Sequence, residues 1–262
     1  MTTLVYPQLA SGALSQFPIH KTRRTRTVTN RAPDGSTIKL ADAAGVTTEW
    51  NLTYADLSDE EAATLQAFFA AAEGTLNGFT FLDPAGNLLA WSGQLGDEVW
   101  QKGPLLSATG GATDPRGGTG AWTIVNSGTA GQSIMQTLAA PGAYQYCLTA
   151  YVRADVATSA QMSIGTVRRE YSVTPSWSRI AMQSSQDAEA TSMRFGIEVN
   201  AMGVVEVFGI QVEAQPWPSG YKRTSRGGVY ENAHMREDVL AIAKTGVNRH
   251  SCSVNILHAN HL

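Results

Sequence analysis

Large apolar side chains alternate with polar ones around residue 50, which predicts a β-strand with one buried face. Trp50, Leu52 and Tyr54 fall on the same face of an extended chain, and polar residues separate them. Phe79 and Phe81 repeat the alternation in a shorter segment that ends at a turn. We therefore expect two strands whose apolar faces contribute to one core.

A helix is predicted between these strands, over about residues 58–73. Ser58 and Glu61 have the spacing of a capping box, in which each side chain accepts a hydrogen bond from the other residue's backbone N–H. The apolar residues that follow have the i, i+3, i+4, i+7 spacing of one helix face: Leu65, Phe68, Phe69 and Ala72. Gly74 supplies a C-terminal stop. This helix can pack its apolar stripe on the first strand.

The pattern changes near residue 92, where helical periodicity ends and short β-type runs alternate with Gly, Ser, Pro and Asp. Eight candidate strands follow, at 121–125, 133–138, 144–152, 161–164, 169–173, 178–183, 192–199 and 204–213. Strands of this number and length fit a two-sheet sandwich or jelly roll. From residue 226 the character changes again, and two or three strands are expected around a turn at residues 244–248.

Composition agrees with a mainly β chain. Of the 262 residues, 43% are hydrophobic, only 16% are charged and 25 are glycine, which is typical of short strands joined by tight turns, and the length favours two domains. The formal net charge of −3 gives no general reason to bind nucleic acid. One basic run contains Arg23, Arg24 and Arg26. We interpret it as an edge strand with outward charges or as an intersubunit salt-bridge surface, and phosphate contact is the less favoured alternative.

The ordered pattern of the first 92 residues resembles a known family. Its parts are Trp50-Asn-Leu-Thr-Tyr54, the Ser58 helix start, Gly78-Phe-Thr-Phe81 and Asp83-Pro84. This order is similar to the N-terminal domain of phage distal tail, tail-hub and minor tail proteins, including those of gene transfer agents. An unrelated α+β domain is the alternative.

The family resemblance implies a structural role. It implies a ring of copies of this chain, expected to be hexameric, that contacts the tail tube protein and tail hub, tip or fibre proteins. Such a protein would be located in the virion tail after assembly in the host cytoplasm.

The β-rich segment carries a second resemblance. It rests on these residues: Asp114-Pro-Arg-Gly-Gly118, Ala121-Trp122, Ala150-Tyr-Val-Arg153, Pro175-Ser-Trp177, Phe208-Gly-Ile-Gln-Val-Glu-Ala214 and Pro218-Ser-Gly-Tyr221. They look like the carbohydrate-binding-module-like jelly rolls of phage tail proteins. The implied organisation is a jelly roll at 93–225, inserted into a split α+β tail-ring domain made of 1–92 and 226–262. The implied role of the jelly roll is host-glycan binding or decoration.

Sugar binding requires flat aromatic rings and polar groups around them. We nominate Trp100, Trp217, Tyr151 and Tyr221 as carbohydrate-binding residues, because Trp100 and Trp217 flank polar or Pro-containing stretches that suit a surface. Two other residues, Trp122 and Trp177, are expected to fill the sandwich core.

No metal, cofactor or disulfide is predicted. The C-terminal group of His234, His250, Cys252, His258 and His261 matches no zinc-finger spacing, so surface histidines or subunit contacts are expected. The carboxylates best suited to a structural calcium are Asp114 and Glu213, but no dense Asp/Asn loop accompanies them. The two cysteines, Cys147 and Cys252, lie in separate predicted strands and are expected to be buried or half-buried thiols.

No catalytic motif is present, which favours a structural protein over an enzyme. Gly-x-Ser-x-Gly, phosphate-binding glycine loops and His-Glu-x-x-His are all missing, and no carboxylate pair stands out among the 22 acidic residues. The alternative is a carbohydrate-active or receptor-binding protein that recognises or degrades a surface polysaccharide, which would need such a pair to cleave it. No signal peptide or long apolar run is visible, so we expect a soluble chain made in the cytosol, without membrane partners.

Overall fold

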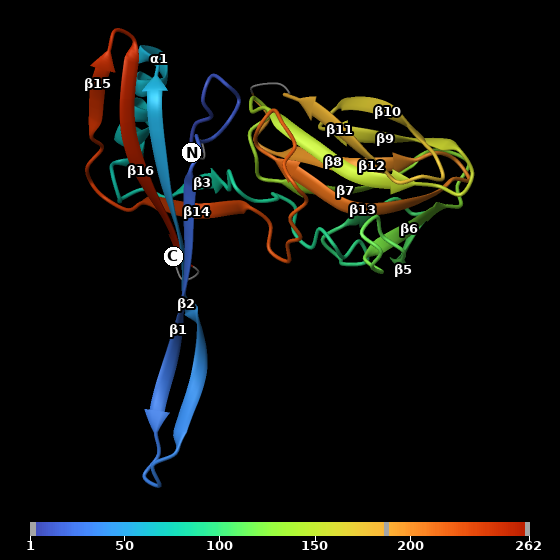
Figure 1. The fold of residues 1–262 in the computed structure, drawn as a ribbon, viewed down its shortest axis with the longest axis horizontal. Coiled ribbons are helices and arrows are strands. Elements are labelled where there is room, and N and C mark those ends of the chain that lie inside the picture. Colours follow the sequence, from blue (N-terminus) through green and yellow to red (C-terminus); the bar gives the residue numbers. More distant parts are fainter. Residues whose placement is uncertain (1–3, 186–188, 260–262) are drawn as a thin grey trace. The chain divides into compact units, whose positions relative to one another are not determined.

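The computed structural model describes residues 4–185 and 189–259 (Figure 1). The described part is mainly β, with one helix and three β-sheets, and this confirms the predicted fold class. The chain divides into two compact units. Unit 1 comprises the residues up to Ala10, Leu14–Phe81 and the residues from Tyr230 on, and unit 2 comprises Ser11–Ala13 and Leu82–Val229.

Unit 1 is built on a sheet that combines strands from both ends of the chain. Its strand order is β1 (Ile19–Arg31), β2 (Thr37–Leu57), β16 (Arg249–Ala259), β14 (Val229–Met235) and β3 (Phe79–Leu82), and β15 (Ile242–Gly246) pairs with β16. The register places Ile256 opposite Trp50 and Val254 opposite Leu52. The last strand of the chain therefore completes the core that the second strand begins.

The helix α1 (Asp59–Ala72) has the predicted start, with Ser58 as N-cap and both bonds of the capping box to Glu61 present. Its C-cap differs from the prediction, because Glu73, before Gly74, already has a left-handed φ of 51°. The helix contributes Phe68 to an aromatic cluster in which neighbouring rings meet mainly edge to face. The other members of this cluster are Tyr6, Trp50, Phe79, Phe81 and Tyr230.

The outer parts of β1 and β2 form a two-stranded ribbon, which extends beyond the rest of the sheet of unit 1 (Figure 1). We call residues 24–47 the arm. Residues on one of its faces include Val28, Ile38 and Leu40, which are 40%, 51% and 52% exposed. An isolated two-stranded ribbon is marginally stable in water. The arm thus presents apolar surface and open strand edges that have no partner within the described residues.

Unit 2 is a sandwich of two five-stranded antiparallel sheets. One sheet has the order β10 (Val167–Val173), β9 (Thr158–Ile164), β12 (Met193–Val199), β7 (Gln132–Leu138) and β4 (Gln101–Lys102). The other has the order β11 (Ser178–Ser184), β8 (Tyr146–Arg153), β13 (Val204–Glu213), β6 (Ala121–Asn126) and β5 (Leu106–Ala112). All eight predicted strands are present. The sequence pattern missed β4 and β5, because β4 is very short and β5 is rich in small and polar residues.

The predicted limits at residues 92 and 226 differ from those of the units, because residues 82–92 are hydrogen-bonded to the sandwich. Asn87 donates its Nδ2–H to the Ile210 carbonyl at 3.0 Å, and its Oδ1 accepts the Val212 N–H at 3.0 Å. The backbone of Ala90 exchanges two hydrogen bonds with the Gln136 amide. These hydrogen bonds satisfy buried polar groups. A prediction based on the spacing of apolar residues does not detect such bonds.

Candidate functional site

A row of three aromatic rings lies on the face of the β11-β8-β13-β6-β5 sheet that points away from the sandwich core. Tyr151 comes from β8 and Phe208 from β13, and their ring centroids are 6.0 Å apart. Tyr221, from the segment after β13, lies 5.2 Å from Phe208. All three rings are half-buried, so each keeps part of its surface accessible. We call these residues the aromatic row.

A β-bulge in β13 aims Phe208 at this face. The pairing of β13 with β8 shifts register between Phe208 and Gln211, and Gly209 in the bulge has a φ of +66°. A Cβ atom on Gly209 would lie 3.0 Å from Cγ of Tyr221. Glycine at this position therefore permits both the backbone conformation and the close approach of the Tyr221 ring.

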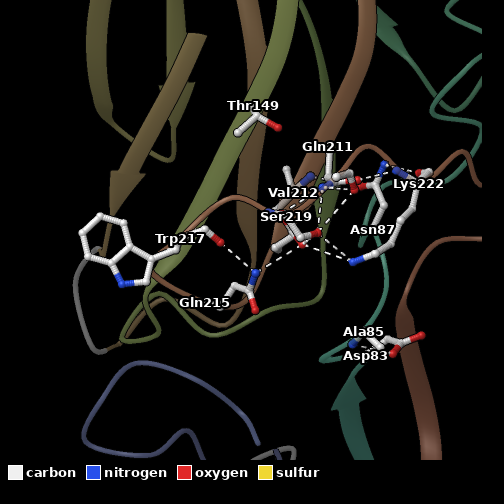
Figure 2. Close-up of polar contacts among 12 residues, drawn as sticks. Asp83, Ala85, Asn87, Thr149, Gln211, Val212, Gln215, Trp217, Ser219 and Lys222 are labelled. Atoms are coloured by element: carbon white, nitrogen blue, oxygen red, sulfur yellow. Dashed lines mark hydrogen bonds and ion pairs between the residues drawn. The ribbon is translucent and has the colours of Figure 1, made fainter. Parts of the chain in front are cut away.

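The segment that carries Tyr221 crosses the outer face of the sheet and is held there by buried polar side chains. We call residues 214–224 the strap. Glu213, which is 2% exposed, accepts the Ser219 N–H at 2.9 Å and pairs with the Lys222 ammonium at 3.4 Å. Gln211 accepts the Lys222 backbone N–H at 2.7 Å, and Figure 2 shows these bonds joining strand and strap. The strap is thus anchored on both sides of Tyr221.

A groove of about 680 Å³ lies beside Phe208 and Tyr221. The other side chains of its lining include Trp122, Arg116, Arg223 and Asp114, and several glycines leave room between them. The volume is within the range of sites that bind small molecules or short oligomers. The groove and the aromatic row together combine flat rings, hydrogen-bond donors and positive charge.

Asp114 organises the loop that carries Arg116. Its carboxylate accepts backbone N–H groups from Arg116, Gly118 and Gly120 at 2.8 to 3.2 Å. Burial raises the pKa of this carboxyl group, but the three backbone N–H groups and the charge of Arg116 outweigh burial and hold the pKa below its ordinary value. Asp114 is therefore ionised at neutral pH and its oxygens are occupied by the chain's own donors.

Guanidinium groups lie against the rings of the aromatic row. Arg116 is 5.6 Å from the ring centroid of Phe208 and 5.9 Å from that of Tyr221, and Arg179 is 5.6 Å from that of Tyr151. The buried Nε of Arg179 has no hydrogen-bond partner among the described residues, although its Nη2 donates to Thr149 and Ser219. Burial raises the pKa of Tyr221, while a hydrogen bond with Ser92 and the charges of Arg223 and Arg116 oppose this rise.

The structure brings two of the nominated carbohydrate-binding residues together, Tyr151 and Tyr221. Trp217 is 72% exposed on the strap but does not line the groove. The prediction of a surface position for Trp100 is wrong, because this side chain is 2% exposed and its Nε1–H donates to the Trp91 carbonyl at 3.1 Å.

The two tryptophans that we expected in the core are half-buried instead. Trp122 lines the groove, where its Nε1–H donates to the Gly93 carbonyl at 3.2 Å. Trp177 lies 5.2 Å from the Arg153 guanidinium. The core expectation is wrong because both residues lie at strand ends: Trp122 is the second residue of β6, and Trp177 comes directly before β11.

Sequence reasoning missed Phe208, Arg116 and Arg223. Two local signals point to Phe208 and Arg116: Gly209 inside an otherwise regular strand, which suggests a bulge, and the Asp-Pro-Arg-Gly-Gly loop that begins at Asp114. No local signal points to Arg223. Neither signal tells which distant segments the loop and the bulge will meet.

The arginines nominated for an oligomer interface, Arg23, Arg24 and Arg26, lie in β1 of unit 1 and are exposed. Arg24 is 3.8 Å from Glu49, and Arg26 forms an ion pair with Asp42. These contacts are across the two strands of the ribbon. The predicted edge strand is confirmed, since β1 is the first strand of its sheet.

The C-terminal histidines and cysteine do not gather around one point in the described part of the chain. No group of three or more His, Cys, Asp or Glu side chains there is placed to hold a metal ion. His250 is bonded to Asp59 at 2.6 Å, His234 contacts the Thr75 carbonyl, and His258 lies against Tyr230. His261 lies outside the described residues. The thiols of Cys147 and Cys252 are buried and unpaired with each other, as expected.

No family model matches the chain, and a search of curated proteins finds no match. Solved structures with some likeness include the C-terminal family 22 carbohydrate-binding module of Clostridium thermocellum, at 12% identity and a TM-score of 0.42 over 53% of this chain and 99% of that one. They also include a xylan-binding domain from Paenibacillus barcinonensis, at 14% identity and a TM-score of 0.40 over 49% and 95% of the two chains.

A third similar structure is the enzymatically active domain of bacteriophage CBA120 tailspike protein 4, at 14% identity and a TM-score of 0.39. The match covers 54% of this chain and 23% of the tailspike chain, so this chain spans about a quarter of that structure. These likenesses are weak and assign no function to this chain. In the described part, no helix is both long enough and apolar enough to cross a membrane.

Proposed function

We propose that this chain is a non-enzymatic structural component of a phage or phage-like tail, in which unit 1 forms a ring and unit 2 binds a host surface glycan. The observation that carries the glycan-binding role is the groove beside Phe208 and Tyr221. Flat rings supply the apolar contact that sugar faces need, and arginine N–H groups supply hydrogen bonds for oxygen atoms.

The arm supports the assembly role. It carries exposed apolar residues on one face and cationic residues along β1, and its strand edges are open. Soluble proteins protect such edges unless they are used for pairing. A neighbouring copy in a head-to-tail ring would cover the arm, and the ring would join the tail tube to the tip proteins.

The non-enzymatic part of the proposal rests on the carboxylates around the groove. Asp114 is the one carboxylate in its lining, and the backbone N–H groups of its own loop occupy its oxygens. Glycoside cleavage requires two carboxyl groups on opposite sides of the bond. Release of reducing ends from a polysaccharide, abolished by a carboxylate substitution in unit 2, would favour the alternative of a glycan-degrading protein.

Glycan binding is tested by titrating the purified protein against capsular and cell-wall polysaccharides in a calorimeter. We expect Phe208→Ala to weaken binding about five-fold, since a stacking aromatic contributes about 1 kcal/mol beyond its buried area. Trp217→Ala is the matched control, because it removes an exposed aromatic residue outside the groove. Equal effects of both substitutions would contradict the assignment of the groove.

Ring formation is tested by native mass measurement, alone and with the tail tube protein. We expect a hexamer or another multiple of three, and we expect the triple variant Val28→Thr, Ile38→Thr, Leu40→Thr to remain folded but monomeric. The control variant changes the opposite face of the arm, with Thr27→Ser, Thr29→Ser and Ala41→Ser. A wild-type protein that stays monomeric with its tail partners would refute the assembly role.

A further inference from the structure

The guanidinium of Arg116 lies near two rings of the aromatic row. It lies within 6 Å of the centroids of both Phe208 and Tyr221, so these rings already have a cation on one face. Arg116 is itself exposed, so its N–H groups are accessible to a ligand. Phe208 and Tyr221 therefore contact an arginine as well as forming part of the groove wall.

The chain neutralises the positive charge of the groove only in part. Neither Arg116 nor Arg223 forms an ion pair with a carboxylate among the described residues. Two other carboxylates of β13 are outside the groove lining and have their own partners, since Glu213 pairs with Lys222 and Glu206 pairs with Arg153.

Asp114 reduces this charge only in part. Its oxygens accept three backbone N–H groups rather than a guanidinium N–H. The half-buried guanidinium of Arg179 adds a further positive charge at the other end of the aromatic row, next to Tyr151. Arg116 and Arg223 are exposed and line the same groove, so both are accessible to an anion.

We propose that the groove binds an acidic polysaccharide, with the carboxylate of a uronic acid residue on the guanidinium groups of Arg116 and Arg223 and the sugar ring near Trp122. This proposal rests on the proposed glycan-binding function and specifies its ligand class. A carboxylate matches a guanidinium in shape and can accept two parallel N–H bonds. A neutral pyranose has no charged group to pair with the two guanidinium groups.

A nucleic acid would also offer anions and flat groups, but the charges favour the polysaccharide. Binding to a phosphate backbone requires a continuous basic track. Here two exposed arginines stand beside an ionised Asp114, in a chain whose formal net charge is −3. A uronate chain places its carboxylates on sugar rings, so one charged residue at a time can enter the groove.

The test uses the full chain and pairs of probes that differ only in charge. The probes are polygalacturonate, alginate and hyaluronate, each compared with its carboxyl-reduced neutral form, and a thymidine oligonucleotide of similar length. We expect at least one uronate polymer to bind about ten-fold more tightly than its reduced form, because a charge-assisted bond is lost on reduction. Added salt is expected to weaken this preference.

Variants separate the geometry of the groove from its charge. Arg116→Gln and Arg223→Gln are expected to remove the preference for the uronate form. Arg116→Lys is also expected to lose most of it, because an ammonium keeps the charge but neither stacks flat nor binds a carboxylate through two bonds. The control is Arg194→Gln, which removes one exposed positive charge of unit 2 from β12, outside the groove.

The outcomes are distinguishable. Equal binding of charged and reduced polymers overturns this inference but leaves the glycan-binding function in place. No binding of any polysaccharide overturns both. Equally tight binding of the oligonucleotide, or an equal loss with Arg194→Gln, shows a general anion effect and also overturns the inference.

Discussion

Buried amide side chains hold the irregular segments of unit 2 in place. Asn126 donates from Nδ2 to the carbonyls of Ala130, Val199 and Asn200, all at about 2.8 to 2.9 Å. The Gln136 amide holds the chain near Ala90 in place, because it donates to the Ala90 carbonyl and accepts the Ala90 N–H. A buried amide without partners would destabilise the fold, so these single residues define where the connecting segments can run.

The two buried thiols, Cys147 and Cys252, are expected to react slowly in the folded protein. Burial raises the pKa of Cys147 to about 12 and that of Cys252 to about 11. Because the thiolate is the reactive form, we expect both to react with a disulfide reagent at about pH 8 far more slowly in the folded protein than in urea. Labelling of the native protein as fast as in urea would contradict this prediction.

The raised pKa values of the two thiols also predict how the free energy of unfolding changes with pH. An unfolded chain loses its thiol protons near the ordinary pKa of about 8.5, whereas the folded protein keeps them. The proton-linked stability is therefore fully present below about pH 8.5 and declines as pH rises toward 11. Urea unfolding at a series of pH values measures this decline.

The strand β13 and the strap act together to form the face that carries the aromatic row. The bulge at Gly209 turns Phe208 outward, and the strap then lays Tyr221 over the bulge. Gln211 and Glu213, which follow the bulge, hold the strap through hydrogen bonds (Figure 2). One irregular strand and one connecting segment thus place two of the three rings of the aromatic row.

Gly209→Ala is expected to lower the free energy of unfolding of unit 2 and to weaken glycan binding. A left-handed backbone at a residue with a Cβ costs about 1 to 2 kcal/mol, and the new methyl group would also meet the Tyr221 ring at 3.0 Å. Urea denaturation gives the first quantity and calorimetric titration the second.

Gly117→Ala is the matched control for this substitution. Gly117 also has a left-handed φ, of +84°, but a Cβ atom there meets nothing within 4 Å. Gly117→Ala therefore measures the free-energy cost of the left-handed backbone alone, without a steric contact such as that between residue 209 and Tyr221. If both variants lose the same stability, the packing of Tyr221 on Gly209 is not important.

The two units are linked as a discontinuous domain and an inserted one. The ends of unit 2 are close together, since the Asp83 N–H donates to the Gly228 carbonyl at 2.7 Å. Insertions of this kind are tolerated because closely spaced ends need not disturb the host domain. Each unit also has its own apolar core, one around the rings of α1 and β2 and one between the two sheets.

We therefore expect residues 82–229 to fold when expressed alone and to show the proposed polysaccharide binding with the same affinity as the full chain. The complementary protein, with Phe81 joined to Tyr230 by a short glycine linker, should keep the assembly behaviour. Urea denaturation of each piece is expected to be cooperative. A piece 82–229 without a cooperative transition would show that the two units depend on each other for stability.

Much of the fold is predictable because alternation and helical spacing are local. The capping box at Ser58, the buried face of Trp50, Leu52 and Tyr54, and the eight strands of the sandwich all follow from neighbours a few residues apart. The failures occur where a side chain's burial depends on distant segments. Trp100 lies in a polar stretch and Trp122 in an apolar strand, yet Trp100 is buried and Trp122 lines the groove.

The periodic pattern of apolar residues thus defines a mainly β chain with one capped helix, since each strand or helix buries its own repeating face. The candidate site depends on tertiary structure alone. Arg116, Trp122, Phe208, Tyr221 and Arg223 come from segments about a hundred residues apart, and they meet only after β6 and β13 pair and the strap is anchored on Glu213. No local sequence pattern predicts that these five residues are close together. The strands that carry them are paired and stabilised by the buried side chains of the sheet, and not by the residues of the groove.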